Sequence, residues 1–352
     1  MVTIQDVARE SGVSVTTVSV ILNKAHQARY IPAQTKNRVK EVVKKLGYHR
    51  NLIASSLRSK RSRTFGVLVF DITDPYCTEI LKGIEGALYR YGYVPILMDA
   101  QNDRGRFNRA VETLLERRID GLIAVAVANF LNLGPDSLKP LVERGIPVVS
   151  VGRRLATPAS SVFTDYKAGT RCALEHLYTL GHREIAFIKG PKDLIDTEQR
   201  WNGIEEFAKA ALLELNPRLI VQIKGRNSSY QEGFELTEEL LRRQRHFTAL
   251  MAFDDITAFG AISALSNAGL RVPQECSVIG FDDIPEAAFY NPPLTTVSQA
   301  LALQGSLSVE VLVQSVRSVG QKKKLTAVYR TVAPKLVVRR TTMTPIQQHA
   351  LA

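Results

Sequence analysis

The stretch TIQDVARESGVSVTTVSVILN, residues 3–23, predicts two short helices around a glycine turn. Thr3 can cap the first helix, and Gly12 stands between the helices, where a residue that tolerates a positive φ is favoured. Ser14 can cap the second helix, whose outward face carries Val15, Thr16, Ser19 and Val20. The pattern is typical of a helix-turn-helix, whose second helix enters a DNA major groove, although an ordinary helical hairpin has the same periodicity.

Positive charge is concentrated at the N-terminal end of the chain. The whole sequence has a formal charge of +12, and residues 1–63 contain thirteen Lys and Arg residues against three acidic ones. A basic head on a nearly neutral body indicates contact with a polyanion such as DNA. The placement of charge therefore favours the DNA-binding interpretation over the simple hairpin.

Length and composition indicate a globular protein of more than one domain. The chain has 352 residues, of which 45% are hydrophobic and 23% charged, which allows a sizeable core. The cysteines, Cys77, Cys172 and Cys276, have no metal-ligand or disulfide spacing. The sequence shows no membrane-length apolar run, no export signal and no HExxH or GxSxG motif. We therefore expect a cytoplasmic protein that is not an enzyme and that needs no metal or cofactor.

From residue 64 onward, apolar runs alternate with amphipathic segments. A first series of expected strands is FGVLVFD, YVPILMD, GLIAVAV and IPVVSVG, and a second is EIAFIKG, RLIVQI, ALMAF and CSVIGF. This alternation predicts parallel sheets with helices on both faces, arranged here as two doubly wound lobes. Ligands of such folds bind outside the carboxyl ends of the strands, so we expect a ligand in the cleft between the lobes.

Residues 3–23 resemble the opening of the lactose-repressor (LacI/GalR) family of bacterial transcriptional regulators. The resemblance continues through GYHRNLIASSLRSKRSRTFGVLV, TDYKAGTRCALEHLYTLGHREIAFIKG, RWNGIEEF, MAFDDITAFGAISAL and VIGFDDIPEAAFYNPPLTTVSQ, to about residue 340. It implies an all-α helix-turn-helix DNA-binding head and an α/β two-lobed effector domain like that of periplasmic binding proteins.

The same resemblance implies domain boundaries. The head would span residues 1–48, a hinge helix or linker 49–63, the effector domain 64–340 and a frayed tail 341–352. Within the effector domain, lobe one would take residues 64–163 and 296–324, and lobe two 164–295 and 325–340. The tail has no leucine heptad, so we expect no tetramer-forming coiled coil.

For the head, the resemblance implies a homodimer on a palindromic operator. Val15, Thr16 and Val20 match the family's base-reading positions, and the two valines can pack on thymine methyl groups. Leu57 matches a leucine that wedges into the minor groove, whereas Thr17 and Ser19 are interpreted as phosphate contacts or as helix packing. The expected DNA-binding residues are Thr3, Ser14, Val15, Thr16, Thr17, Ser19, Val20, Asn23, Arg29, Tyr48, Asn51, Ala54, Leu57 and Arg58.

For the lobes, the resemblance implies a small-molecule effector, which we expect to be a sugar, with a purine or a phosphoprotein partner as alternatives. Arg200 and Asp282 match the family's ligand-contacting arginine and aspartate, a pair that suits hydroxyl groups. Asp254 stands where many relatives carry asparagine, and Asp165 and Asp255 can equally cap helices. The expected effector-binding residues are Asp74, Tyr76, Gln101, Phe163, Arg200, Tyr230, Asp254 and Asp282.

The resulting hypothesis is a cytoplasmic, nucleoid-associated repressor of bacterial transcription that is controlled by its effector. A solute-binding protein for uptake would have the same two-lobed body. The basic head and the missing export signal argue against this alternative. A hydrolase on an α/β scaffold is a third possibility, for which the sequence offers no catalytic constellation.

Overall fold

The computed structural model describes residues 2–22, 26–48, 61–125, 138–154, 159–192, 194–225, 227–243, 246–321 and 326–345. The chain divides into two compact units, Met1–Ser62 and Arg63–Ala352. Of the expected DNA-binding residues, Asn23, Asn51, Ala54, Leu57 and Arg58 lie outside the described residues, as does most of the expected hinge.

The first unit is a small helical domain, as the sequence predicts. It consists of α1 (Ile4–Ser11), α2 (Val15–Leu22), the 3-10 helix η1 (His26–Tyr30) and α3 (Ala33–Lys45). Its core is formed by six buried apolar side chains from α1, α2 and α3, namely Val7, Ala8, Val18, Ile21, Val39 and Val42.

Local signals set the ends of the first two helices. Thr3 caps α1 in a capping box, because its hydroxyl accepts from the backbone N–H of Asp6 while the Asp6 carboxylate accepts from the backbone N–H of Thr3. Gly12 has φ +63° after the end of α1, and Ser14 accepts a hydrogen bond from the backbone N–H of Thr17 at 3.1 Å. The helix-turn-helix prediction is therefore confirmed in its caps and its turn.

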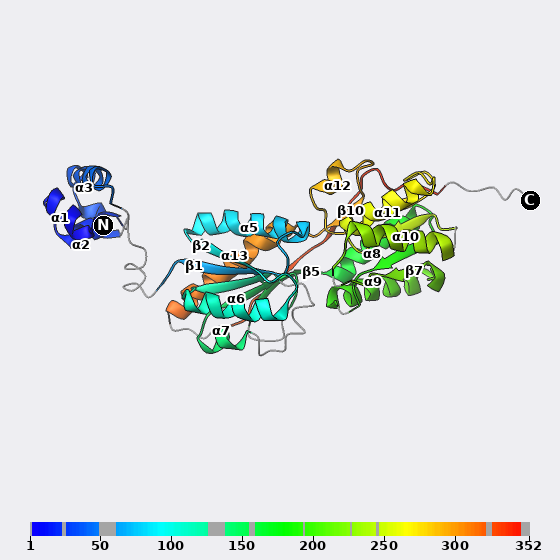
Figure 1. Cartoon of the computed structure of the whole chain (residues 1–352), viewed down its shortest axis with the longest axis horizontal. Helices are drawn as coiled ribbons and strands as arrows, with labels where there is room; N and C mark the ends of the chain where they lie inside the picture. The colour runs from blue at the N-terminus through cyan, green and yellow to red at the C-terminus, as the bar shows by residue number, and fades with distance from the viewer. Residues whose placement is uncertain are drawn as a thin grey trace, which may run out of the picture. The chain divides into compact units, whose positions relative to one another are not determined.

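The second unit begins with lobe one, a six-stranded sheet in the order β11-β5-β4-β3-β1-β2 with all pairs parallel. Helices α5 and α13 cover one face of this sheet and α6 covers the other (Figure 1). The elements are β1 (Thr64–Val69), α5 (Pro75–Tyr91), β2 (Val94–Asp99), α6 (Arg104–Glu116), β3 (Gly121–Val125), α7 (Lys139–Glu143), β4 (Val148–Val151), β5 (Ser160–Thr164), α13 (Leu301–Gly320) and β11 (Tyr329–Val332).

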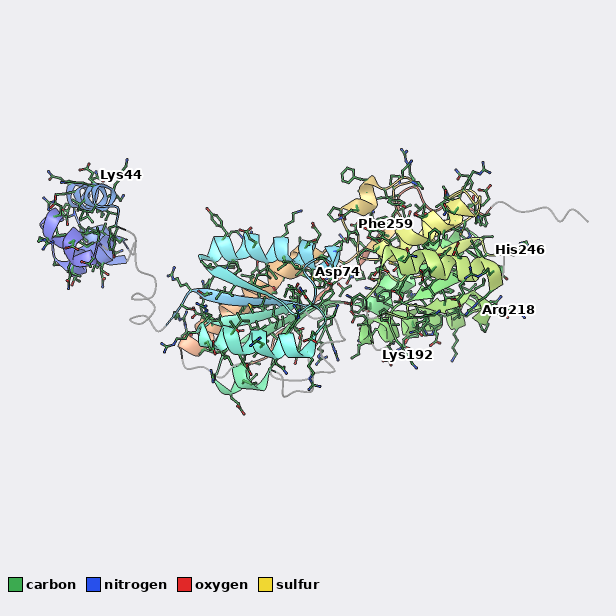
Figure 2. All side chains as sticks on the ribbon, in the orientation of Figure 1. Lys44, Asp74, Lys192, Arg218, His246 and Phe259 are labelled. Carbon is green, nitrogen blue, oxygen red and sulfur yellow. The ribbon has the colours of Figure 1, made fainter. Side chains whose placement is uncertain are left out.

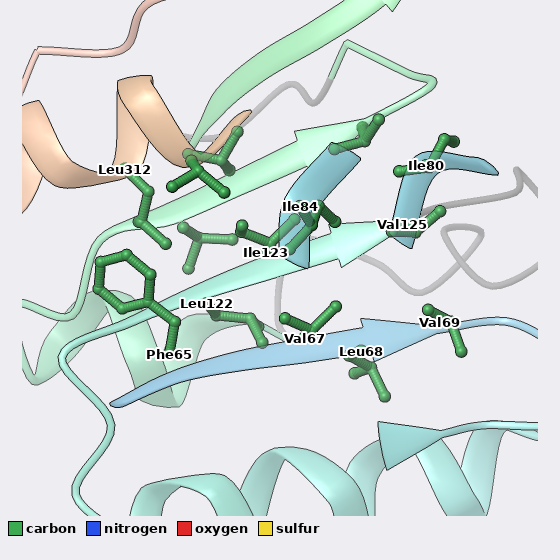
Figure 3. Packing of buried hydrophobic residues seen from close by; sticks show 14 of the residues in the cluster. Phe65, Val67, Leu68, Val69, Ile80, Ile84, Leu122, Ile123, Val125 and Leu312 are labelled. Atoms are coloured by element: carbon green, nitrogen blue, oxygen red, sulfur yellow. The ribbon is translucent and has the colours of Figure 1, made fainter. Parts of the chain in front are cut away.

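The centre of lobe one is apolar on both faces of its sheet, which explains why its strands read as continuous hydrophobic runs. Figure 3 shows Val67 of β1 and Ile123 of β3 on the side of Ile84 and Leu312, which belong to α5 and α13, whereas Leu68 of β1 points to the opposite face of the sheet. Gly83 of α5 and Gly305 of α13 let these helices approach closely, because a Cβ at either position would collide with the backbone of the other helix.

Lobe two has a four-stranded parallel sheet in the order β7-β6-β8-β9. Helices α8 and α9 pack as one pair and α10 and α11 as another. Side chains of β6 alternate between the cores on the two faces, with Phe187 in one and Ile188 in the other. The elements are α8 (Tyr166–Thr179), β6 (Ile185–Lys189), α9 (Ile195–Ala211), the 3-10 helix η4 (Pro217–Leu219), β7 (Ile220–Gln222), α10 (Tyr230–Arg243), β8 (Ala249–Met251), α11 (Asp255–Asn267), β9 (Ser277–Ile279) and α12 (Glu286–Phe289).

The assignment of residues 325–340 to lobe two is wrong in part. Strand β11 pairs with β5 and belongs to the sheet of lobe one. Only the following strand, β12 (Lys335–Val337), lies with lobe two, where it pairs antiparallel with β10 (Thr296–Ser298). The assignment of residues 296–298 to lobe one is therefore wrong as well, because Val297 of β10 packs in the core of lobe two. The last crossover between the lobes therefore comes after β11, whose parallel pairing with β5 satisfies the backbone N–H and C=O groups at that edge of the sheet.

The prediction of a frayed tail from residue 341 is also wrong for its first residues. Thr341 is fully buried, donates to the carbonyl of Val278 at 2.6 Å and accepts from the backbone N–H of Thr295 at 2.8 Å. The Nε2 atom of buried His182 donates to the carbonyl of Met343 at 2.8 Å. Residues 341–343 are thus held by buried hydrogen bonds, whereas residues 346–352 lie outside the described residues.

Candidate functional site

A cavity of about 50 Å³ lies between the two lobes, at the carboxyl ends of β1, β8 and β9. This is the edge at which the sequence predicts a ligand, because loops that follow parallel strands gather there. Its lining residues are Phe70, Asp74, Tyr76, Leu194, Asp196, Arg200, Asn227, Ser228, Phe253, Asp254, Asp255, Ile256, Asp282 and Ile284.

Arg200 is a buried cation in the wall of this cavity, 7% exposed. Its guanidinium carbon lies 3.9 Å from the ring centroid of Phe281 and 4.4 Å from that of Phe253. Its Nη1 donates to the carbonyl of Phe253, and its Nη2 lies 3.4 Å from Oδ1 of Asp282. Aromatic faces and a carboxylate together hold the guanidinium in place, as a desolvated cation requires.

Asp282 is the partner of Arg200 and has an unusual backbone. Its φ of +116° is outside the range that non-glycine residues favour, which is a form of strain common at binding sites. Gln299 donates to the same Oδ1 atom at 2.5 Å. Burial raises the pKa of Asp282 well above its usual value, and the Arg200 guanidinium opposes that shift.

The hydrogen bonds of Asp282 continue into the crossovers between the lobes. Gln304 donates to the carbonyl of Gln299 and to the hydroxyl of Thr164, each at 2.9 Å. Thr164 ends β5 at the first crossover, and Gln299 follows β10 at the second. Side-chain hydrogen bonds therefore link Asp282 to two of the segments in which the chain crosses between the lobes.

Asp74 and Asp254 face the cavity from different lobes. Asp74 caps α5 by accepting from the backbone N–H of Tyr76 at 2.9 Å, and Figure 2 labels it at the end of that helix. Asp254 caps α11 by accepting from the backbone N–H of Thr257 at 2.8 Å. Burial and then the charge of Asp254 raise the pKa of Asp74 to about 7.

The other two aspartates of the lining differ in their bonding. Burial raises the pKa of Asp196 to about 6, and its Oδ1 has no hydrogen-bond partner. The sequence allows Asp255 to cap a helix, but the cap of α11 is Asp254. Asp255 instead accepts hydrogen bonds from the Thr296 hydroxyl and from the backbone N–H of Ile284, the latter at 2.9 Å. Asp255 therefore ties α11 to β10, with its pKa raised to about 8 by burial. Asp165, by contrast, caps α8.

The structure brings together five of the eight expected effector-binding residues, which are Asp74, Tyr76, Arg200, Asp254 and Asp282. The other three lie outside the lining. Gln101 is exposed after β2, Phe163 is half-buried on β5, and Tyr230 is 53% exposed and stacks on Phe259 at 6.1 Å.

The sequence analysis missed Asp196, Asn227 and Phe253 in the lining. Asp196 precedes Arg200 by four residues in α9, so helical spacing from the arginine could have identified it. Asn227 accepts a hydrogen bond from Asn102 at 2.6 Å, which joins lobe two to lobe one beside the cavity. No local motif marks a contact between residues 125 positions apart.

On the head, the expected base-reading residues stand on the open side of α2. Val15 is 37% exposed, Thr16 is exposed and Val20 is half-buried. Ser19, expected as a phosphate contact or in helix packing, is also half-buried. Thr17 bonds to Ser14 within the cap, which supports helix packing as its role. Arg29 is exposed over the ring of Tyr30, and Tyr48 packs against the head's core.

The part of the chain that the structure describes contains no group of three or more His, Cys, Asp or Glu side chains that could hold a metal ion. None of its helices is long and apolar enough to cross a membrane.

Comparisons with known proteins agree with this geometry. A family profile described as "Periplasmic binding proteins and sugar binding domain of LacI family" matches residues 62–333, and one described as "Bacterial regulatory proteins, lacI family" matches residues 3–51. The "HTH-type transcriptional repressor PurR" of Haemophilus influenzae (strain PittEE) is 32% identical over 345 residues, covering 97% of this chain and 98% of the relative.

Solved structures show the same fold. The "lac repressor dimer bound to operator and the anti-inducer ONPF" has a TM-score of 0.82 at 27% identity, covering 97% of this chain and 99% of that one. The "transcriptional regulator CelR-cellobiose complex" has a TM-score of 0.70 at 28% identity, covering 97% and 100%. With a basic helix-turn-helix head, two doubly wound lobes and a charged cavity between them, the chain belongs to the LacI family of bacterial transcriptional regulators.

Proposed function

We propose that two copies of this regulator bind an inverted-repeat operator and repress transcription, and that a small carbohydrate in the cleft changes their affinity for DNA. The protein would act in the cytoplasm, at the nucleoid, and would catalyse no reaction. The observation that carries the proposal is the buried Arg200–Asp282 pair in the cavity of a chain that also has a basic helix-turn-helix head.

The head supports sequence-specific binding to double-stranded DNA. Its second helix exposes small side chains, which can approach base edges, and its surface carries cations that can contact phosphates. Two identical heads related by a two-fold axis require two half-sites in inverted orientation. The lac repressor structure of similar fold, described as a dimer on operator, supports this arrangement.

The cavity supports a hydroxyl-rich ligand. Carboxylates from both lobes offer hydrogen-bond acceptors, and aromatic side chains such as Phe70 and Phe253 offer flat apolar faces for a sugar ring. The cellobiose complex of the structural relative supports a carbohydrate. The aromatic lining also suits a planar base, so a purine is the second candidate.

Coupling between the cleft and DNA would follow from the arrangement of the lobes. A ligand that contacts both walls favours the closed cleft, and the bonds from Asp282 through Gln299 and Gln304 connect the ligand site to the crossovers. Residues 49–63 would then pass the change to the heads, as a hinge helix that forms on the operator. A coupling free energy of about 1–3 kcal/mol is enough for such control.

The proposal is tested by selecting duplexes from a random pool with the purified full-length chain. We expect an inverted repeat to be enriched and its affinity to change by roughly 5–150-fold when an effector from a sugar and nucleoside panel is added. Selection of no common sequence, or of sites without two-fold symmetry, would contradict the proposal.

A further inference from the structure

Asp74 and Asp254 present unused carboxylate oxygens to the same cavity from opposite lobes. Each caps a helix through its Oδ1, with Asp74 at the start of α5 and Asp254 at the start of α11. Neither makes an ion pair among the salt bridges of the described residues. The negative charge of Asp254 disfavours the ionised form of Asp74 across the cavity, so the two carboxylates oppose each other there.

The cations that the structure describes near the cavity already interact with other groups. Arg200 is the only cationic side chain among the lining residues, and it lies against Asp282 and the carbonyl of Phe253. Arg153 interacts electrostatically with Asp196. Asp255 is satisfied by Thr296 and Ile284. The acidic pair Asp74 and Asp254 therefore lacks a positive charge within the described lining.

An independent observation also indicates that the cavity needs a hydrogen-bond donor. Asp196 is only 8% exposed and lines the cavity, yet its Oδ1 has no hydrogen-bond partner. A buried acceptor without a partner is costly, and a ligand that brings a donor removes that cost. The described lining thus holds an acidic pair without a counter-charge and an acceptor without a donor.

We propose that the effector carries a protonated amine as well as hydroxyl groups, and that this amine lies between Asp74 and Asp254 and joins the two lobes. This inference rests on the proposed function, because it takes the cleft to be the effector site. An ammonium group supplies three donors and one positive charge, so it turns the repulsion between the aspartates into attraction for a common partner. The ligand class is an amino sugar or a similar hydroxylated amine, in preference to a neutral or phosphorylated sugar.

The test uses the full-length chain and calorimetric titration with matched ligands. Three epimeric hexosamines are compared with the parent hexoses, with their N-acetyl derivatives and with the hexose 6-phosphates. We expect at least one hexosamine to bind at least tenfold more tightly than its N-acetyl derivative, which keeps the ring but loses the charge. Equal or tighter binding of the neutral or phosphorylated partners would overturn the proposal, as would the absence of binding by all hexosamines.

Variants assign the effect to the two aspartates. Asp254→Asn and Asp74→Asn should each abolish the preference for the amine, and asparagine still caps a helix, so both should fold. Asp103→Asn, at the cap of α6, is the matched control and should keep the preference.

The outcomes separate this inference from the proposed function. A preference that survives both Asp254→Asn and Asp74→Asn would contradict the placement of the amine. If a neutral sugar alone binds and changes operator affinity, the amine is excluded while the proposed function stands. If no inverted repeat is selected by the chain, the proposed function fails whatever the cavity binds.

Discussion

The head and the effector unit use charge in opposite ways. In the head, charged side chains are exposed, as with the pair of Lys45 and Glu10, whose side chains are 70% and 45% exposed. In the effector unit, the side chains of Arg200 and Asp282 are only 8% and 10% exposed, and several aspartates around the pair are buried. Exposed charges contribute little to stability and are screened by salt, whereas buried charges are costly to leave unpaired and respond to pH.

The difference indicates how each region recognises its partner. The head can meet the dense, regular charge of DNA with mobile surface cations, because counterion release supplies much of that affinity. The cleft must distinguish small molecules, and a fixed, desolvated set of donors and acceptors does this better. Substitutions of single buried and exposed side chains test that contrast.

Removal of a buried cation should cost far more than removal of an exposed one. Arg200→Ala leaves Asp282 buried without its counter-charge, and we expect a loss of about 3–5 kcal/mol of unfolding free energy. Arg218→Ala, at an exposed arginine labelled in Figure 2, should change it by less than about 0.5 kcal/mol. Urea denaturation followed by circular dichroism measures both. Equal losses would remove the basis of the contrast.

Loss of a buried hydrogen-bonding group should also cost more stability than loss of an exposed one where the group is neutral, as at the end of the chain. Thr341→Val keeps the shape of a fully buried side chain but leaves the backbone N–H of Thr295 and the carbonyl of Val278 without their partner. We expect a loss of about 1–3 kcal/mol. Thr78→Val, at an exposed threonine of α5, is the control and should be nearly neutral. Denaturation midpoints that coincide would show that the tail is not held by these bonds.

The buried acids should make stability depend on pH in a defined direction. The pKa of Asp74 is raised from 3.8 to about 7, so the folded state binds its proton more tightly than the unfolded state does. The resulting contribution to the free energy of unfolding is complete below pH 3.8 and is lost as the pH rises to about 7. From pH 5 to pH 7, the free energy of unfolding should therefore fall by about 2 kcal/mol more in wild type than in Asp74→Asn. Asp196 and Asp255 also have raised pKa values and lower the stability in the same direction in both proteins, so the difference between wild type and variant reports on Asp74. A difference that is constant with pH, or of opposite sign, would contradict the assignment.

The smallest effect concerns base reading by the head. Val20 is half-buried on α2, and we hypothesise that it packs on a thymine methyl group of the operator half-site. Val20→Ala removes two methyl groups and should lower affinity for the thymine operator by about 1 kcal/mol while flattening the preference among the four bases there. Competition binding with all four substitutions measures this preference. An unchanged preference in Val20→Ala would exclude the contact.

Local signals were the most predictable part of the molecule. The caps at Thr3 and Ser14 and the positive φ of Gly12 depend on neighbours a few residues away, so the sequence alone was enough for the helix-turn-helix. Parallel strands were equally clear, because strands buried on both faces are continuous apolar runs.

Contacts between distant residues were harder to predict. Arg200 and Asp282 are 82 positions apart and were expected only because they match a family pattern. The place of β11 in lobe one and the bonds of Thr341 depend on which sheet edge a late segment reaches, and no local pattern specifies that. Gln101, Phe163 and Tyr230 lie outside the cavity lining for the same reason: a strand end does not determine which of its side chains faces the other lobe.

The salt dependence of operator binding tests the central contrast most directly. A head variant, Arg29→Gln with Arg38→Gln and Lys44→Gln, is compared with a control of equal charge, Arg109→Gln with Arg117→Gln and Lys209→Gln, in which all six positions are exposed. For wild type and the control, the logarithm of the association constant should fall with the logarithm of salt concentration with a slope of about −5 or steeper, as six or more phosphate contacts require. The head variant should show a clearly shallower slope. A slope near zero for wild type, or equal slopes for the two variants, would contradict the assignment of DNA binding to the exposed charges of the head.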